Sequence, residues 1–322
     1  MKAIVHDRYG SADVLDLRDV DRPVIKDDDV LVRVRAAAVN FGDWAAMRGW
    51  PYALRLVYGL RGPRVRVRGR DVAGTVEAVG AAANRLRPGD EIYAETATGS
   101  FAEYARVPER VAALKPAGLT FEQAAAVPVA GTTALQCVRD GGRVQPGMTV
   151  LINGASGGVG TFAVQIAKAF GAEVTGVCSA RNAEQARTLG ATHVLDYATD
   201  DFTRAGRRYD VILDLVGNHS LADCRRVLEP NGVLVLSSGG GNSWFGPIGR
   251  LVRAVATSPF GRQTLRPVAA RRSREDLEAL TALIESGAVT PVIEHVYPLS
   301  DGAAALRYFE EEHARAKIVI TV

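Results

Sequence analysis

The chain has 322 residues, which is enough for two domains with separate cores. Its 47% hydrophobic and 23% charged residues are typical of a soluble globular protein, and a net charge of +3 without a long basic run does not indicate nucleic-acid binding. Three widely separated cysteines, Cys137, Cys178 and Cys224, indicate neither a disulfide framework nor a cysteine-rich zinc site. Met1 leads directly into a strand-like pattern without a signal peptide, and no apolar run reaches membrane-spanning length, so we expect a cytoplasmic protein without membrane contact.

Residues 1–118 have the pattern of short strands joined by turns. Asp29–Ala36 alternates apolar and charged side chains, as a half-buried strand does. Turn signals separate three further predicted strands, Val72–Val79, Glu91–Glu95 and Phe101–Val107. The segment therefore predicts an all-β or α+β module. Its arginine-rich stretch, residues 61–70, is expected to be an edge or surface stretch with outward arginines.

From about residue 120 the pattern changes to alternating helices and strands, which is typical of a parallel sheet covered by helices. Thr120 and Gln123 fit a capping box for a helix that begins at Phe121. A second helix is predicted at Gly131–Arg139. Strands are predicted near Thr149–Ile152, Glu173–Val177, His193–Leu195, Asp210–Leu215, Gly232–Ser237 and Leu265–Val268.

The end of the chain is expected to return to the first module. Ser273 and Ser300 are the predicted start signals of two further helices. Ile318–Val322 is strand-like, and a terminal strand of this kind is best used by pairing with the strands of residues 1–118.

The segment after Thr149–Ile152 has the spacing of a dinucleotide-binding turn, with alanine in the first glycine position. Apolar residues then recur at helical spacing from Phe162 to Phe170, so the order is strand, tight turn, helix. Small residues let the backbone approach a pyrophosphate, and a helix N-terminus presents free N–H groups to it. The predicted pyrophosphate-binding residues are Ala155, Ser156, Gly157, Gly158, Val159 and Gly160.

The next strand ends about 20 residues further on, where a ribose-binding side chain is expected. An NAD site usually has Asp or Glu there, whereas this chain has Cys178, Ser179 and then Arg181. A hydroxyl and a guanidinium can hold a 2′-phosphate, and no carboxylate repels one. We therefore predict NADPH as the cofactor, bound by Ser179 and Arg181. The alternative is that Arg181 is a solvated residue at a helix start.

Five segments in order are similar to those of the medium-chain dehydrogenase/reductase superfamily, within its zinc-free quinone oxidoreductase-like branch. They are Ala37–Asp43, Gly69–Val76, Gly89–Tyr93 with Gly99–Tyr104, Ala124–Ala134 and the glycine-rich turn. The resemblance implies an α/β protein with a GroES-like β domain, residues 1–120 completed by 289–322. It also implies a Rossmann dinucleotide-binding domain with a doubly wound parallel sheet, residues 121–288, and a homodimer.

The differences from the zinc-dependent members of this superfamily predict a protein without a metal site. Arg70-Asp71 stands where those members have a histidine ligand, and Val39–Phe41 lacks their early cysteine. The five histidines of the chain do not rebuild a three-ligand site at recognisable spacing. Without a metal, carbonyl polarisation must come from hydrogen-bond donors and the cofactor, which favours an acceptor that takes hydride at carbon.

The resemblance also implies individual site residues. Asn40 matches an asparagine near the nicotinamide, Thr132 matches a threonine beside it, and Tyr197 resembles a tyrosine near the adenosine 2′-phosphate. Relatives often line the substrate pocket with aromatic residues from the segment after the first helix, and among these Tyr52 is our first choice as donor to the acceptor oxygen. For Asn40 the alternative is a turn residue at a strand end, and for the aromatics a plain core role.

Two more cofactor contacts follow from the rule that strand carboxyl ends face the cofactor crevice. Val216 follows the fourth predicted strand of the parallel sheet and Ser238 the fifth. The predicted function is NADPH-dependent, zinc-independent hydride transfer to a quinone or α,β-unsaturated carbonyl. Reduction of enoyl thioesters or 2-alkenals is the alternative within enzymes. An NADPH-binding regulatory or RNA-contacting protein with weak turnover is the alternative outside them.

Overall fold

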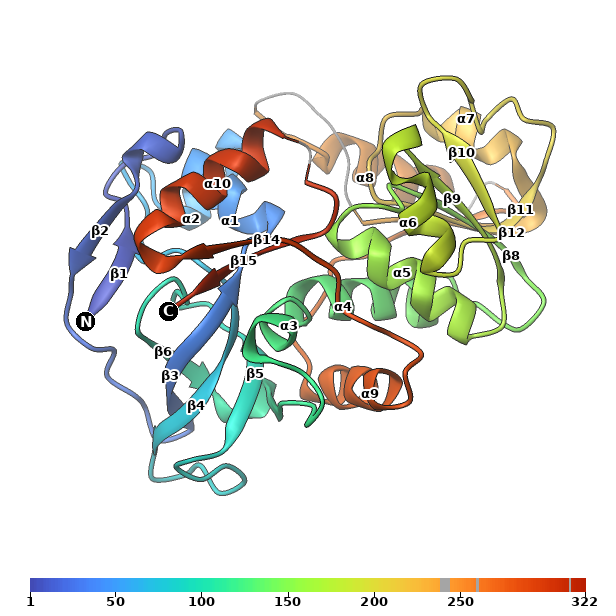
Figure 1. Cartoon of the computed structure of the whole chain (residues 1–322). Helices are drawn as coiled ribbons and strands as arrows, with labels where there is room; N and C mark the ends of the chain where they lie inside the picture. Colours follow the sequence, from blue (N-terminus) through green and yellow to red (C-terminus); the bar gives the residue numbers. More distant parts are fainter. Residues whose placement is uncertain (238–243, 259–260, 313) are drawn as a thin grey trace. The chain divides into compact units, whose positions relative to one another are not determined.

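The computed structural model describes residues 1–237, 244–258, 261–312 and 314–322. The chain divides into two compact units, shown in Figure 1. One unit, named the β unit below, comprises Met1–Thr132, Arg272–Glu285 and Pro291–Val322. The other, named the α/β unit, comprises Thr133–Arg271 and Ser286–Thr290.

The β unit is built on a sheet in which the described strands follow the order β14-β15-β3-β4-β5-β7, with β6 also paired to β3. These strands are β3 Asp29–Ala38, β4 Asp71–Val79, β5 Glu91–Glu95, β6 Tyr104–Pro108, β7 Ala112–Leu114, β14 Ile293–Pro298 and β15 Lys317–Thr321. A separate antiparallel pair joins β1 Lys2–Val5 to β2 Asp16–Asp19. The predicted return of the last strand is confirmed, because β15 lies between β14 and β3.

Alternating apolar residues explain how this sheet buries its core. Val30, Val32 and Val34 of β3 are nearly fully buried, together with Val76 and Ile92 of the neighbouring strands β4 and β5. Burying a side chain of this size contributes about 1.5–3 kcal/mol. The predicted strand at Phe101–Val107 begins later, at Tyr104, because Phe101 lies against β1 and its carbonyl accepts a hydrogen bond from Ile4 N at 2.8 Å.

The helices of the β unit cover this sheet and its edges. They are α1 Phe41–Arg48, α2 Arg55–Tyr58, α3 Phe121–Ala125, α9 Arg274–Glu285 and α10 Gly302–Glu311, with 3-10 turns η1 Ala12–Val14, η2 Tyr52–Leu54, η3 Glu109–Val111 and η7 Leu299–Asp301. The predicted capping box is confirmed, since Gln123 N donates to Thr120 Oγ1 at 3.2 Å and Thr120 N to Gln123 Oε1 at 3.0 Å. The predicted start of α9 is confirmed too, since Asp276 N donates to Ser273 Oγ at 3.1 Å.

The arginine-rich stretch differs from the prediction at one position. Arg66 is exposed and forms an ion pair with Asp7, as an outward arginine would. Arg68 instead is buried, with 7% of its surface exposed, and its guanidinium donates to the Val65 carbonyl. The stretch pairs with β1 only through an isolated bridge between Val5 and Val67, so strict alternation along a strand does not apply.

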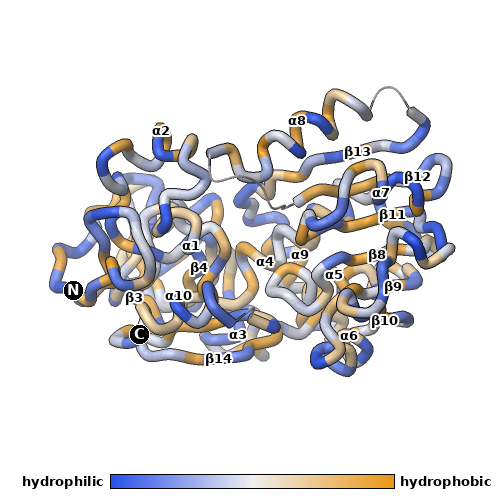
Figure 2. The backbone as a smooth tube through the Cα atoms, turned by 90° about the horizontal axis from the view of Figure 1, so that it is seen from above, coloured by the Kyte–Doolittle hydropathy of each residue, from blue (hydrophilic) through white to orange (hydrophobic). Residues whose placement is uncertain are grey.

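The α/β unit contains a parallel sheet whose described strands follow the order β10-β9-β8-β11-β12-β13. Figure 2 shows this order, with β13 and β10 at opposite edges. The strands are β8 Thr149–Asn153, β9 Glu173–Cys178, β10 His193–Asp196, β11 Tyr209–Asp214, β12 Leu228–Leu236 and β13 Thr264–Pro267. In chain order this is 3-2-1-4-5-6, which confirms the predicted doubly wound sheet.

The helices of the α/β unit are α5 Gly158–Ala169, α6 Ala183–Thr188, α7 Leu221–Arg226 and α8 Ile248–Thr257, with a 3-10 turn η5 Ala180–Asn182 and a π-helix η4 Gln136–Gly141. The helix α4, Pro128–Leu135, begins in the β unit and continues into this one. Val150, Leu151 and Ile152 of the first strand are fully buried, as a central parallel strand requires. No described helix is long and apolar enough to span a bilayer.

The predicted domain boundaries at residues 120 and 289 stay a prediction. In the structure, α3 packs on β3 and β4, and α9 packs on β7. The buried Tyr93 hydroxyl of β5 donates to the Leu277 carbonyl of α9 at 2.6 Å. These contacts place both helices in the β unit.

Candidate functional site

The glycine-rich turn joins β8 to α5 in a conformation that only small residues allow. Gly154 has a φ of +93°, and Gly157 is the N-cap of the 12-residue helix α5. A Cβ at Gly160 would lie 2.0 Å from the Gly154 carbonyl oxygen, so a side chain there cannot be accommodated. A Cβ at Gly157 would lie 3.5 Å from the same atom, an ordinary contact, so packing within the chain does not require that glycine.

Ala155 replaces the first glycine of the usual pattern without opening the turn. Its side chain is fully buried, and its N–H donates to the Val177 carbonyl of β9 at 3.0 Å. Gly176 makes room for it, because a Cβ at Gly176 would lie 3.0 Å from the Ala155 methyl carbon. The turn thus keeps the close approach of strand and helix that a dinucleotide pyrophosphate needs.

The carboxyl ends of β9 and β10 bring together the residues predicted to bind the 2′-phosphate. Cys178 and Asp196, the last residues of these strands, are register partners. Ser179 and Arg181 follow β9, and Tyr197, 61% exposed, follows β10 and donates its N–H to the Cys178 carbonyl at 3.2 Å. Asp196 is the carboxylate at this edge, and its Oδ1 accepts from Ala198 N at 3.1 Å within its own turn.

Asn182 links these residues to the glycine-rich turn. Its amide nitrogen donates to Ser156 Oγ at 3.1 Å, while its amide oxygen is buried without a hydrogen-bond partner among the residues that the structure describes. A buried acceptor of this kind is costly unless a ligand or water donates to it. The orphaned oxygen beside a turn that excludes any Cβ at Gly160 therefore fits a dinucleotide with hydroxyl and amino donors.

Asp214, at the end of β11, organises the neighbouring turn. Its buried carboxylate accepts from Asn153 Nδ2 at 2.9 Å and from Gly217 N at 2.8 Å. Val216 in this turn is 44% exposed and reaches Gly154, where an added Cβ would lie 2.8 Å from a Val216 methyl carbon. The structure thus brings Val216 next to the glycine-rich turn, while Ser238 lies outside the described residues. We call these ends of β8, β9, β10 and β11 the carboxyl edge.

A buried polar cluster lies in the β unit around Asn40, Asp71 and Lys317, and we call it the buried cluster. Lys317 Nζ donates to Asp71 Oδ2 at 3.0 Å, Asn40 Oδ1 at 2.5 Å and the Val39 carbonyl at 3.2 Å. The side chains of Lys317 and Asp71 are 2% and 0% exposed. Asn40 Nδ2 donates to Asp71 Oδ2 at 2.9 Å and to the Ala38 carbonyl at 3.2 Å.

The buried cluster fixes how Asn40 can be used. Both of its amide hydrogens are directed at atoms of the chain, which assigns the amide orientation. Its Oδ1 accepts one bond from Lys317 and can accept a second. Asn40 can therefore accept from a hydroxyl but has no amide hydrogen left for a substrate oxygen.

Two helix starts surround the buried cluster. Asn40 is the N-cap of α1, and its N–H donates to Asp43 Oδ2 at 2.9 Å. Burial raises the pKa of Asp43 to about 6. Asp71 uses its second oxygen to accept from Val129 N, in the first turn of α4, at 2.8 Å. Thr132, the predicted nicotinamide neighbour, lies one turn further along α4 and is 3% exposed.

Tyr52 lies in η2 and is 40% exposed. The Arg55 guanidinium carbon lies 4.5 Å from the Tyr52 ring centroid and 4.7 Å from that of Tyr9. Phe41, Trp44 and Trp50 form a separate aromatic group, with ring centroids 5.2 to 5.8 Å apart. After α1, Trp50 joins this group, and Tyr52 is partly exposed.

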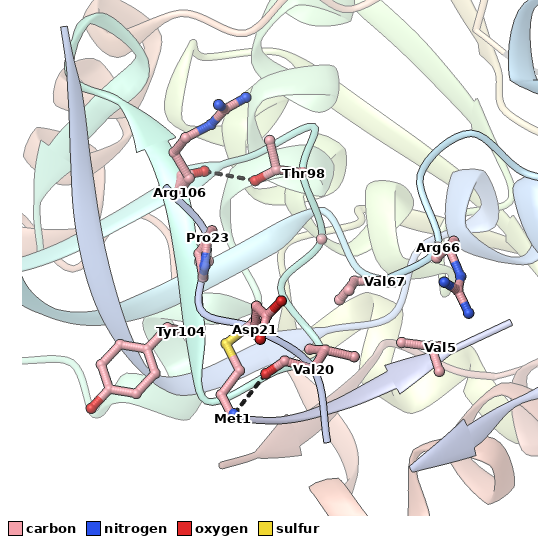
Figure 3. A pocket seen from close by; sticks show the side chains of 12 residues that line it. Met1, Val5, Val20, Asp21, Pro23, Arg66, Val67, Thr98, Tyr104 and Arg106 are labelled. Carbon is pink, nitrogen blue, oxygen red and sulfur yellow. Dashed lines mark hydrogen bonds between the residues drawn. The ribbon is translucent and has the colours of Figure 1, made fainter. Parts of the chain in front are cut away.

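A mainly apolar cavity of about 250 Å³ in the β unit lies between β1, β2 and β6. Figure 3 shows Thr98 and Met1 at its wall, where the Thr98 hydroxyl donates to the Arg106 carbonyl at 2.9 Å and the Met1 amine to the Val20 carbonyl at 2.8 Å. None of the predicted site residues that the structure describes lines it, so we assign it no part in the reaction.

Metal binding finds no support in the side chains that the structure describes. No group of three or more His, Cys, Asp or Glu residues among them could hold an ion. Arg70, at the position of the zinc enzymes' histidine, forms an ion pair with Glu95. Burial lowers the pKa of the fully buried His6 to about 4. Zinc independence stays a prediction.

Sequence reasoning missed the partners that hold the predicted residues. Lys317 is not among the predicted site residues, yet it opens β15, which lies between β14 and β3. Asp71 similarly opens β4, whose first residues are buried. The sequence did offer a signal for Lys317 and Asp71: each is a charged residue at the start of an apolar strand. Asp214 carried a different signal, since it is a charged residue at the end of the apolar strand β11.

Comparisons with known proteins agree with this architecture. The model of the alcohol dehydrogenase GroES-like domain matches residues 26–117, and that of a zinc-binding dehydrogenase matches residues 189–320. The chain is 35% identical to the chloroplastic NADPH-dependent alkenal/one oxidoreductase of Arabidopsis thaliana, covering 99% of this chain and 79% of that protein. It is 30% identical to a chloroplast envelope quinone oxidoreductase homolog of the same plant, covering 99% and 98%.

A solved structure, the quinone oxidoreductase from Coxiella burnetii, has a TM-score of 0.86 and 29% identity, covering 100% of this chain and 99% of that one. A GroES-like domain and a Rossmann sheet with a glycine-rich turn define a class of two-domain, dinucleotide-dependent oxidoreductases. Within that class, the chain belongs to the medium-chain dehydrogenase/reductase superfamily.

Proposed function

We propose that the protein is an NADPH-dependent, zinc-independent oxidoreductase that reduces a quinone or an α,β-unsaturated carbonyl. The carboxyl edge carries the proposal: Ser179 and Arg181 follow β9 and Tyr197 follows the adjacent β10, where the adenosine ribose is expected, and Asp196 is held by its own turn. The names of relatives that reduce alkenals, alkenones and quinones support the acceptor class.

The cofactor would be held along the carboxyl edge. The glycine-rich turn and α5 would receive the pyrophosphate, Ser179 and Arg181 the 2′-phosphate, and Val216 would pack near the turn. When bound, NADPH supplies a hydride to an electron-poor carbon of the acceptor, which then takes one proton from water or a nearby hydroxyl. This chemistry suits conjugated acceptors because their carbonyl oxygen receives the displaced electron pair.

Residues of the β unit would orient the reactants. Asn40 Oδ1, already fixed by Lys317, would accept from a ribose hydroxyl, since its amide hydrogens are occupied. Thr132 would provide a second hydroxyl contact beside the nicotinamide. Tyr52 would donate to the acceptor oxygen as charge develops there. Asn40 and Tyr52 are the proposed catalytic residues.

The test is oxidation of NADPH and, separately, NADH by the purified, chelator-treated protein with a quinone, an enone, a 2-alkenal and an enoyl thioester. Turnover of the quinone or enone with NADPH, unchanged by chelator, is the expected result. Turnover that needs added zinc, or a strong preference for NADH, would contradict the proposal. Tight NADPH binding without turnover would favour a binding protein, and salt-sensitive RNA affinity would then identify its partner.

We further propose that the protein is a cytoplasmic homodimer. The edge strand β13 of the α/β sheet leaves one row of backbone groups unpaired by the other strands of that sheet, which suits pairing with a second copy. Light scattering of the purified protein tests the dimer, and a single species of monomer mass at micromolar concentration would reject it.

A further inference from the structure

A cavity of about 280 Å³ in the α/β unit has basic walls that neither the glycine-rich turn nor the 2′-phosphate residues supply. The turn after β11, the start of α7 and the first two turns of α8 border it. Gly217, His219, Arg250 and Arg253 are among its lining residues.

Arg250 presents unused donors at this cavity. Its Nη2 donates to Asp214 Oδ2 at 2.5 Å and to the His219 carbonyl at 3.3 Å. Its Nε and Nη1 are buried and have no nitrogen or oxygen acceptor within the described residues, and 13% of the side chain is exposed. Arg250 also makes a side-chain hydrogen bond with the buried Cys224 thiol, but a neutral thiol is a weak acceptor. Buried guanidinium donors without an acceptor are costly, which points to a ligand or water that accepts from them.

Arg253 adds a charge that nothing nearby balances. It is exposed, and it makes no ion pair with any residue that the structure describes. Of the carboxylates around the cavity, Asp214 is bound by Arg250, and Asp223 is bound by Ser220 and Arg226.

The remaining carboxylate near the cavity is Asp201, which lies 3.9 Å from His219 Nδ1. Since Asp214 cancels Arg250 and the other carboxylates have partners of their own, the positive charge of Arg253 is left over. The wall is therefore suited to an anion.

The position of the cavity decides which anion it can bind. The pyrophosphate is expected at α5, after β8, and the 2′-phosphate beyond β9 and β10. β11 lies on the opposite side of β8 from β9, where the nicotinamide half of a dinucleotide extends. The cofactor thus has no phosphate left for this cavity.

We propose that the cavity of Arg250 and Arg253 binds a carboxylate or phosphate group carried by the acceptor, so that the preferred acceptors are anionic enones or quinones. This inference rests on the proposed reductase function. It assigns Arg253 as a specificity-determining residue that contacts the acceptor away from the reacting carbons.

The experiment compares kcat/KM for three enones of equal chain length, ending in a methyl, a carboxylate or a phosphate. The proteins are the wild type, Arg253→Gln, Arg253→Lys and a control, Arg262→Gln, which removes an exposed arginine of the same unit outside the cavity. We expect the wild type to prefer at least one anionic enone about tenfold, and Arg253→Gln to remove that preference without changing the rate for the neutral enone. Arg253→Lys should keep part of it, and Arg262→Gln all of it.

The two anionic substrates distinguish a carboxylate from a phosphate site. Equal preference in the wild type and Arg253→Gln, or an equal loss for neutral and anionic enones, would overturn the proposal. If no enone is reduced, the proposed function has failed, and the cavity is then tested by titrating inorganic phosphate into the NADPH-treated protein by calorimetry. Binding that Arg253→Gln weakens and Arg262→Gln does not would support the anion site, and identical titrations would reject it.

Discussion

The buried cluster and the carboxyl edge use polar residues in opposite ways. In the buried cluster, Lys317 places its three hydrogens on three acceptors, and Asp71 receives donors on both oxygens. At the carboxyl edge and the adjoining cavity, Asn182 Oδ1 and two Arg250 nitrogens are buried without nitrogen or oxygen partners in the described chain, and Tyr197 is mostly exposed.

This difference separates residues that hold a site in shape from residues that receive a ligand. A complete internal network gains nothing from a ligand, so it can keep Asn40 in one orientation before any ligand binds. Unused donors and acceptors gain a partner only on binding, so their contribution appears in affinity. Substitutions in the buried cluster should therefore change the free energy of unfolding, and substitutions at the carboxyl edge should change cofactor affinity.

The largest effect is expected from breaking the buried ion pair. Lys317→Met leaves Asp71 buried without its cation, which should lower the free energy of unfolding by about 3–5 kcal/mol in urea denaturation. Adding Asp71→Asn to this variant removes the unpaired charge and should restore part of the loss. A single variant as stable as the wild type would mean that the cluster is not essential to the fold.

A second prediction uses pH to compare two buried groups of the β unit. Burial raises the pKa of Asp43 to about 6, so its folded state binds the proton more tightly than its unfolded state, and the stability it contributes is lost as pH rises from about 4 to about 6. A difference of about two in pKa corresponds to about 3 kcal/mol. Asp43→Asn should therefore gain up to this amount over the wild type between pH 4 and pH 7.

The pH dependence of the unfolding free energy should have the opposite sign for His6. Burial lowers its pKa from 6.5 to about 4, so its contribution is present above pH 6.5 and is lost as pH falls toward 4. His6→Gln should gain on the wild type toward low pH, whereas Asp43→Asn gains toward neutral pH. Equal pH slopes of unfolding free energy in both variants and the wild type would show that neither pKa is shifted.

At the carboxyl edge the expected change is in affinity. Arg181→Gln should weaken NADPH binding about tenfold and leave NADH binding nearly unchanged, because only NADPH carries the 2′-phosphate. Arg187→Gln, which removes an exposed arginine at the end of α6, is the control. Fluorescence titration measures both constants. An equal loss for the two cofactors would place Arg181 away from the 2′-phosphate.

The smallest effects concern one helix cap in each unit. Thr120 Oγ1 accepts from Gln123 N at 3.2 Å in the β unit, and Ser220 Oγ accepts from Asp223 N at 3.1 Å in the α/β unit. Thr120→Ala and Ser220→Ala should each cost about 1 kcal/mol. Hydrogen exchange should show the loss at α3 for the first variant and at α7 for the second, and the reverse pattern would contradict the assignment of caps.

The sequence predicted elements well where one local pattern decided them. Asp29–Ala36 and the strands of the parallel sheet were found because apolar periodicity and turn signals agree there. The turn from Ala155 to Gly160 was found because its small residues are dictated by one close approach. Phe101 was included in a strand that begins only at Tyr104, since a period of two does not say where the pairing of a strand starts.

The buried cluster could not be predicted, because it joins residues far apart in the chain. Asn40, Asp71 and Lys317 meet only after β3, β4 and β15 have joined one sheet. The resemblance pointed to Asn40, but a charged residue at the start of a strand, as at Asp71 and Lys317, does not show by itself which residues it will meet. The same holds for Asp214 and Arg250, which lie on β11 and α8.

The place of Lys317 in the chain has a consequence for biosynthesis. The α/β unit ends at Thr290, so a ribosome has made all of it before it reaches β15. Domains generally fold as units during synthesis, so the α/β unit can form while β3 still lacks its neighbour β15. Until Lys317 is added, Asp71 has no cation beside it, and the orientation of Asn40 is open. The nascent chain would thus acquire the ability to bind NADPH before it acquires a finished active site.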